Sequence, residues 1–120
     1  MLTPKELAME AVKALDEKKA GDIRLLKVND VTSIADYFVI CTANSTTQIK
    51  SLADIAEAKL EEMGEKLIHR EGFRSGGWVL LDYGCIIVHI FMDETRKFYN
   101  LERLWSDAAE EDISGIISEN

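Results

Sequence analysis

Apolar residues at helical spacing predict three helices along the chain. The first begins at the capping box Thr3-Pro4-Lys5-Glu6, in which the proline suits the first helical position. The second begins at another capping box, Ser45-Thr-Thr-Gln48, and is expected to end at Gly64. Asn100 is placed to cap a last short helical turn over residues 101–105.

Five further segments have the pattern of β-strands. They are residues 23–28, 36–42 and 67–69 and the two halves of a hairpin within residues 76–91. The run 36–42 is apolar almost throughout, which predicts a central strand covered on both faces. The order α-β-β-α-β-β-β-α predicts an α+β fold, with a mixed five-stranded sheet and two main helices packed on it.

The hairpin carries the most informative pattern, because its two apolar runs pivot at Gly84 with Cys85 or Tyr83 beside it. Successive strand side chains point to opposite faces, so a two-residue turn sorts them into two sets. One set is purely aliphatic and is expected to face a core: Val79, Leu81, Ile86, Val88 and Ile90. The other set mixes aromatic, aliphatic and polar side chains: Trp78, Leu80, Asp82, Ile87, His89 and Phe91.

The mixed face fits two interpretations. A tryptophan beside an acid on an open sheet face is typical of a protein-docking surface. Alternatively, a helix or loop covers the face and leaves His89 and Asp82 at its edge. The pattern alone leaves both open.

The net charge of −8 is unevenly distributed along the 120 residues. Residues 107–120 hold five acids and no Lys or Arg, which leaves 17 acids against 14 bases in the rest. We therefore expect a single domain over residues 1–108 and an acidic tail over 109–120, frayed or loosely docked. The chain has no basic stripe of the kind that binds nucleic acid, and no apolar run of membrane-spanning or signal-peptide length.

Residues that could carry chemistry do not form a recognisable set. His69 and His89 stand alone, and the two cysteines, Cys41 and Cys85, lie far apart among apolar neighbours, as expected of reduced thiols in a cytosolic protein. The Gly76-Gly77 pair is not followed by a helix start, so it does not form a phosphate loop. We expect no catalytic, cofactor-binding or metal site.

Two small groups of basic residues flank the hairpin. The second group, Arg96, Lys97 and Arg103, is interspersed with Glu94 and Glu102. We expect ordinary solvated surface here, the alternative being an ion-pairing rim around the Trp78 face.

Three blocks of sequence resemble the ribosomal silencing factor family, also called Iojap-like. The first is Ala35-Asp-Tyr-Phe-Val-Ile-Cys-Thr-Ala-Asn-Ser-Thr-Thr-Gln48. The second is Trp78-Val-Leu-Leu-Asp-Tyr-Gly84 followed by Ile-Val-His-Ile-Phe at 87–91. The third is Arg96-Lys-Phe-Tyr-Asn-Leu-Glu-Arg-Leu-Trp105 with Asp107-Ala108. The blocks occur in the family's order and span about residues 3–108.

This resemblance implies a cytoplasmic protein that binds the large ribosomal subunit through the ribosomal protein numbered fourteen. Bound there, it would block joining with the small subunit and repress translation, whereas organelle relatives serve in large-subunit assembly. Family members commonly form homodimers, and their fold is likened to nucleotidyltransferases. The implied partner-binding residues are Trp78, Asp82 and Tyr83, with Leu80 and His89 as neighbours on the hairpin.

One residue departs from the family pattern. Family members usually carry an acid directly after the hairpin glycine, where this chain has Cys85, so Asp82 is the nearer acid. The fold likeness also raises a rival function, a nucleotide-handling enzyme with Asp36, Ser45 and Asp82 near a phosphate. The chain lacks the Gly-Ser and the paired acids that such an enzyme needs, so we expect a non-catalytic protein.

Overall fold

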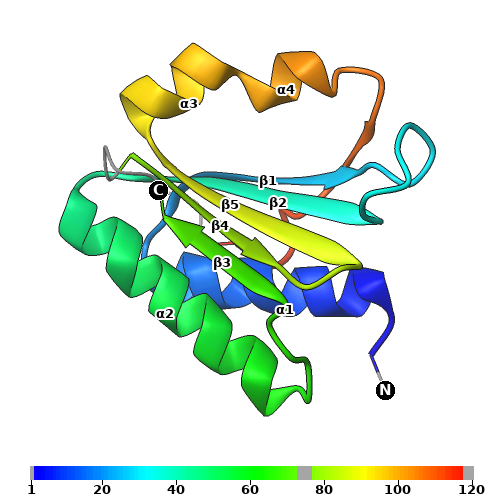
Figure 1. The fold of residues 1–120 in the computed structure, drawn as a ribbon, viewed down its shortest axis with the longest axis horizontal. Coiled ribbons are helices and arrows are strands. Elements are labelled where there is room, and N and C mark those ends of the chain that lie inside the picture. The colour runs from blue at the N-terminus through cyan, green and yellow to red at the C-terminus, as the bar shows by residue number, and fades with distance from the viewer. Residues whose placement is uncertain (1, 73–76, 118–120) are drawn as a thin grey trace.

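The computed structural model describes residues 2–72 and 77–117, which form three layers (Figure 1). A mixed sheet lies in the middle, helices α1 and α2 cover one face, and α3 and α4 cross the other. Residues 73–76 lie outside the described part of the chain, and with them Gly76 of the predicted Gly76-Gly77 pair.

The α+β class is confirmed, but the predicted count of five strands is wrong. The described residues form six strands in the order β3-β4-β5-β2-β1-β6. Only β2 and β5 pair in parallel among them, and the other neighbours are antiparallel. The bounds are β1 Gly21–Lys27, β2 Tyr37–Ala43, β3 His69–Gly72, β4 Trp78–Asp82, β5 Ile86–Met92 and β6 Ala109–Glu111. The central position predicted for residues 36–42 is confirmed by β2, which is buried at all but one residue.

Both predicted helix starts are present. Helix α1 (Pro4–Glu17) has the full capping box, in which the Thr3 hydroxyl accepts from the Glu6 N–H at 3.1 Å and the Glu6 carboxylate accepts from the Thr3 N–H at 2.9 Å. Helix α2 (Thr46–Glu62) has half of one, because the Ser45 hydroxyl accepts from the Gln48 N–H at 3.0 Å while the Gln48 side chain turns to Asn44.

Asn100 joins the two short helices, α3 (Asp93–Tyr99) and α4 (Leu101–Leu104). Its backbone is left-handed, with φ of 47°, and this ends α3. Its side chain then accepts from the Arg103 N–H at 3.3 Å, as the predicted cap requires.

The sheet separates two cores of unequal size. The larger lies between the sheet and α1–α2, and the smaller lies under α3–α4. The larger core contains the whole aliphatic set predicted for the hairpin: Val79, Leu81, Ile86, Val88 and Ile90. The smaller includes Phe38, Ile40, Ile87 and Phe91, with Leu101 and Trp105 of the α4 region packed against it.

The acidic segment after residue 108 is docked over its described part. Residues 109–111 form β6, which pairs with the outer edge of β1, and Ile113 is buried in the larger core. Ion pairs fasten the strand, since Glu111 meets Lys5 at 3.1 Å and Glu110 meets Arg24 at 3.1 Å. The expected boundary at residue 109 therefore does not coincide with a break in the packing. The sequence Ala-Glu-Glu has no apolar alternation that would predict a strand. It forms one because its backbone pairs with an open sheet edge.

Candidate docking surface

The hairpin turn has the geometry that its sequence predicts. Gly84 and Cys85 form the two-residue loop, closed by the Tyr83 N–H donating to the Ile86 carbonyl at 2.9 Å. Gly84 has a φ of +82°, which favours glycine at that position. Asp82 supports the turn, since its carboxylate accepts from the Gly84 N–H at 2.8 Å.

The mixed face of the hairpin is assembled as predicted. Strand register places Trp78 opposite Phe91, Leu80 opposite His89, and Asp82 opposite Ile87. One part of this face is covered and another part is half-open; the docking interpretation of the half-open part stays a prediction. The α3–α4 segment covers the side nearest β2, where the rings of Trp105 and Phe38 meet edge to face at 5.4 Å. On β4, by contrast, Trp78, Leu80 and Asp82 are only half-buried.

Two aromatic residues of α3 extend this half-open face. Tyr99 lies against Trp78 with ring centroids 4.8 Å apart, and Phe98 lies edge to face against Tyr99 at 5.1 Å. Phe98 is 81% exposed and Tyr99 is 50% exposed, high values for large aromatic side chains. The hairpin pattern did not predict that Phe98 and Tyr99 belong to this face, because they lie outside the hairpin. Both residues lie inside the third block of the family resemblance.

Strand β3 adds polar side chains next to β4. Register places His69 opposite Asp82 and Glu71 opposite Leu80, so both share the Trp78 face. His69 and Glu71 contact each other at 2.8 Å and are exposed. We call the resulting set the β4–α3 surface: Glu71, Trp78, Leu80, Asp82, Phe98 and Tyr99.

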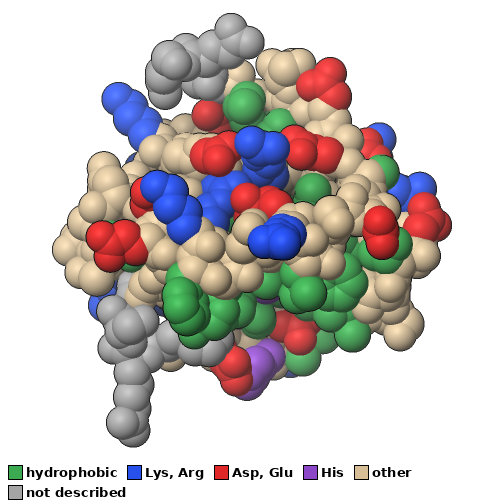
Figure 2. Space-filling model, turned by 90° about the horizontal axis from the view of Figure 1, so that it is seen from above, with side chains coloured by type: hydrophobic (Ala, Val, Ile, Leu, Met, Phe, Trp, Pro, Cys, Tyr) green, Lys and Arg blue, Asp and Glu red, His purple; other side chains and the backbone are tan. Residues whose placement is uncertain are grey.

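Figure 2 looks onto the side of the molecule that carries α3 and α4. Hydrophobic side chains gather in a band along the lower margin of that view. Lys, Arg, Asp and Glu are interspersed above the band, so this side presents no stretch of one charge sign. The exposed large hydrophobic residues on α3 and α4 are Phe98, Tyr99 and Leu104.

Two of the predicted partner-binding residues do not reach the β4–α3 surface. Tyr83 is buried in the larger core, on the opposite side of the sheet, and burial with the nearby Glu57 raises its pKa to about 12. His89 is 5% exposed in the centre of the smaller core, so it does not lie at an edge. Burial lowers the pKa of His89 to about 3, which keeps the imidazole neutral.

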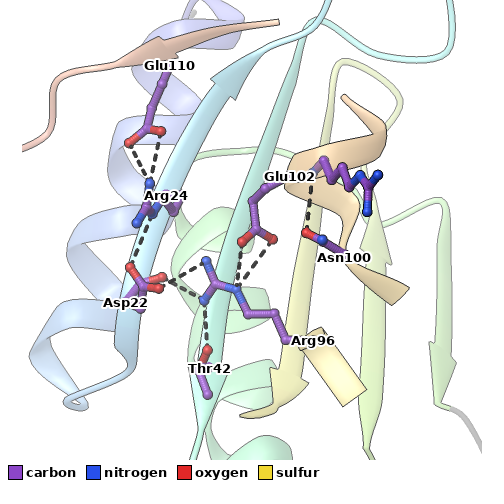
Figure 3. Close-up of polar contacts among 8 residues, drawn as sticks. Asp22, Arg24, Thr42, Arg96, Asn100, Glu102 and Glu110 are labelled. Atoms are coloured by element: carbon purple, nitrogen blue, oxygen red, sulfur yellow. Dashed lines mark hydrogen bonds and ion pairs between the residues drawn. The ribbon is translucent and has the colours of Figure 1, made fainter. Parts of the chain in front are cut away.

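Arg96 overturns the expectation of a solvated basic group. It is 5% exposed and points from α3 down onto the sheet, where its guanidinium donates to the Asp22 carbonyl and to the Thr42 hydroxyl, each at 2.7 Å (Figure 3). It also pairs with Glu102 of α4 at 3.3 Å. Arg96 therefore joins both short helices to β1 and β2. Its neighbour Lys97 is exposed, as expected.

The described residues provide neither a metal-binding cluster nor a thiol with a lowered pKa. Among residues 2–72 and 77–117, no three His, Cys, Asp or Glu side chains lie where they could hold a metal ion. Burial raises the pKa of the Cys41 thiol to about 12 and also raises that of Cys85. In the same part of the chain, no helix is long and apolar enough to cross a membrane.

The fold is that of a small α+β domain, and its β4–α3 surface exposes aromatic side chains beside acids. The family model described as "ribosomal silencing factor during starvation" matches residues 2–120, and the chain belongs to this family. The match includes residues 109–120, beyond the three blocks of the sequence resemblance.

Several relatives support this assignment. The ribosomal silencing factor of Halalkalibacterium halodurans is 38% identical over 117 residues, which cover 98% of this chain and all of that protein. The chloroplastic Iojap protein of Zea mays is 38% identical over 84% of this chain and 44% of that protein. A crystal structure from Chromobacterium violaceum superposes with a TM-score of 0.84 at 32% identity, covering 96% of both chains. The family confirms a non-enzymatic ribosomal silencing function, and the nucleotide-handling alternative has no support among these relatives.

Proposed function

We propose that this chain binds the large ribosomal subunit through the β4–α3 surface and thereby keeps the small subunit from joining. Its contact there is the large-subunit protein numbered fourteen, as the family resemblance implies. The proposal is carried by one observation, the half-buried Trp78 backed by rings and flanked by the exposed Phe98 and Tyr99.

Aromatic side chains suit an interface of this kind. Tryptophan and tyrosine dominate binding free energy where they fill the centre of a contact that excludes water. A specific complex buries about 800 Å² on each partner, and a cluster of three aromatic residues with Leu80 supplies its apolar centre. A chain of 13.5 kDa that holds such a contact can block a much larger particle by occupancy alone.

The charges of the surface favour a basic protein as its partner. Glu71 and Asp82 lie on the Trp78 face, and the whole chain carries a net charge of −8. This charge repels the phosphates of ribosomal RNA and attracts a basic protein exposed among them, which selects one docking pose. Because the Gly84 N–H occupies only one oxygen of Asp82, that carboxylate can also accept a bond from a partner.

Three further properties accompany this proposal on the strength of the family resemblance. The protein acts in the cytoplasm, it forms homodimers, and its sheet resembles that of nucleotidyltransferases. Light scattering coupled to size-exclusion chromatography measures the second property directly, since a dimer doubles the mass of 13.5 kDa.

The experiment measures binding to purified large subunits by sedimentation, and subunit joining by light scattering. Phe98→Ala is the cleanest variant, because Phe98 is 81% exposed and contributes little to the core. Trp78→Ala removes the central ring and is expected to weaken binding by about 2 kcal/mol or more. Both variants are expected to inhibit subunit joining less, in proportion to their lower occupancy.

Val31→Ala is the matched control, since it truncates an exposed apolar side chain outside the β4–α3 surface. We expect it to bind and inhibit like the parent. If both aromatic variants sediment with large subunits as well as the parent does, the docking surface lies elsewhere on the molecule. If Trp78→Ala lowers the melting temperature sharply but the folded protein binds normally, Trp78 serves the core alone.

A further inference from the structure

We propose that His89 is a positioning residue of the docking surface, because its buried imidazole sets the orientation of the Trp78 indole. This inference rests on the proposed function, in which Trp78 contacts the partner. The indole N–H of Trp78 lies 3.2 Å from Nδ1 of His89, diagonally across the β4–β5 pair. The tryptophan is half-buried, whereas the histidine is 5% exposed and cannot itself touch a partner.

The chemistry of the two rings fixes the form of His89. An indole N–H can only donate a hydrogen bond, so Nδ1 of His89 must be the acceptor. The ring proton then resides on Nε2, which is buried and has no hydrogen-bond partner among the described residues. Apolar side chains surround the imidazole. Phe38 lies edge to face at 5.0 Å, Phe91 lies nearly parallel at 6.1 Å, and Leu80 and Ile40 are its register partners on the two neighbouring strands.

A purely apolar side chain at position 89 would therefore fit its surroundings better than histidine does. Burying an imidazole N–H without a partner destabilises the fold, and leucine would avoid that penalty. The hydrogen bond to Trp78 is the polar contact that the structure gives His89 in return. Histidine at position 89 therefore orients the indole of Trp78 at some cost in the stability of the core.

Ring contacts alone leave the indole two orientations. Phe91 lies against it at 4.8 Å and Tyr99 at 4.8 Å, and such contacts hold the plane of the ring. They do not distinguish between the two indole orientations that differ by about 180° in the outer side-chain torsion, because that torsion is broad and roughly two-fold in aromatic side chains. The bond to His89 selects one of the two. A surface held in its bound orientation loses less conformational freedom on docking.

The test compares two substitutions of similar size. His89→Leu removes the acceptor, whereas His89→Asn places an amide oxygen near the position of Nδ1. We expect His89→Leu to melt at or above the temperature of the parent, yet to bind large subunits about three- to tenfold more weakly, the effect of one hydrogen bond. His89→Asn is expected to recover most of that affinity.

Nuclear magnetic resonance gives a readout independent of ribosomes. The chain has two tryptophans, so its nitrogen–proton spectrum contains two indole peaks. We expect His89→Leu to move the peak of Trp78 and broaden it, while that of Trp105, which packs on Phe38, changes less. An unmoved Trp78 peak would overturn the proposed bond whatever the binding result.

A double-mutant cycle separates positioning from a general structural role. Phenylalanine at position 78 has no N–H, so in a Trp78→Phe background His89→Leu is expected to leave binding unchanged. An equal loss of affinity in both backgrounds, or parental affinity for His89→Leu itself, would contradict the inference. If Trp78→Ala and Phe98→Ala both bind like the parent, the proposed docking surface fails, and the indole spectrum still decides whether His89 orients Trp78.

Discussion

Arg96 offers the sharpest test of how the α3–α4 segment is held on the sheet. Its guanidinium reaches the backbone of β1 at Asp22 and the side chain of β2 at Thr42, and it pairs with Glu102 on α4 (Figure 3). The substitution Arg96→Met removes the charge and the donors but retains a long apolar stem. Arg96→Lys retains the charge and loses the planar fork.

The size of the effect follows from the surroundings of each partner. Removing one member of a buried ion pair costs about 3–5 kcal/mol when the other is left unpaired and buried. Here the stranded acids can reach water, because the side chains of Glu102 and Asp22 are 32% and 58% exposed. Two hydrogen bonds of 2.7 Å are lost as well, each contributing about 1 kcal/mol or somewhat more. We therefore expect Arg96→Met to lower the free energy of unfolding by about 2–3 kcal/mol, and Arg96→Lys by roughly half as much.

Urea unfolding followed by tryptophan fluorescence measures this change, and hydrogen exchange locates it. We expect amides of α3 and α4 to exchange faster in Arg96→Met, while those of α1 and α2 keep their protection. Lys97→Met is the matched control. It makes the same change one residue away, where the side chain is 76% exposed and pairs with Asp93 at 3.0 Å, so it is expected to cost under about 0.5 kcal/mol. Equal stability of Arg96→Met and Lys97→Met would refute the anchoring role of Arg96.

Three shorter predictions concern the turn, the acidic segment and acid stability. Asp82→Asn keeps the turn acceptor but loses the charge, so we expect sedimentation to show binding weaker by about 1–3 kcal/mol. Adding Cys85→Asp to the Asp82→Asn variant is expected to recover part of that loss. Deleting residues 109–120 removes β6 and the buried Ile113, so thermal melting should reveal a loss of at least about 2 kcal/mol. Because the folded pKa of His89 is about 3 against 6.5 ordinarily, protons favour the unfolded chain below pH 6.5. Acidification from above pH 6.5 to pH 4.5 should then lower the free energy of unfolding by about 2–3 kcal/mol more in the parent than in His89→Leu.

Local rules recovered most of the fold from the sequence. The full capping box of α1, the Ser45 cap of α2, the Asn100 cap and the Gly84 turn depend on residues within four positions of one another, and each is present. The sorting of hairpin side chains follows from strand alternation alone, and it is confirmed on both faces. These features require no knowledge of distant segments.

Long-range contacts explain what the sequence did not predict. Strand β6 forms because β1 has an open edge, and nothing in Ala-Glu-Glu indicates it. Arg96 stands among alternating charges like a solvated residue, but Thr42 and the Asp22 carbonyl lie beneath α3 and take it out of water. The two interpretations of the Trp78 face could not be resolved for the same reason. The position of α4 decides which part of that face is covered.

A protein that acts by occupancy benefits from a surface that is already in its bound shape. The β4–α3 surface combines segments separated in the sequence, yet each is fixed to the same sheet. Trp78 is held by Phe91 and His89 of β5, and Tyr99 is carried by a helix that Arg96 fastens to β1 and β2. Ordering loose side chains would otherwise consume part of the free energy of docking. If the proposed docking is right, the backbone of β4 and α3 should therefore differ little between the free protein and its complex with the large subunit.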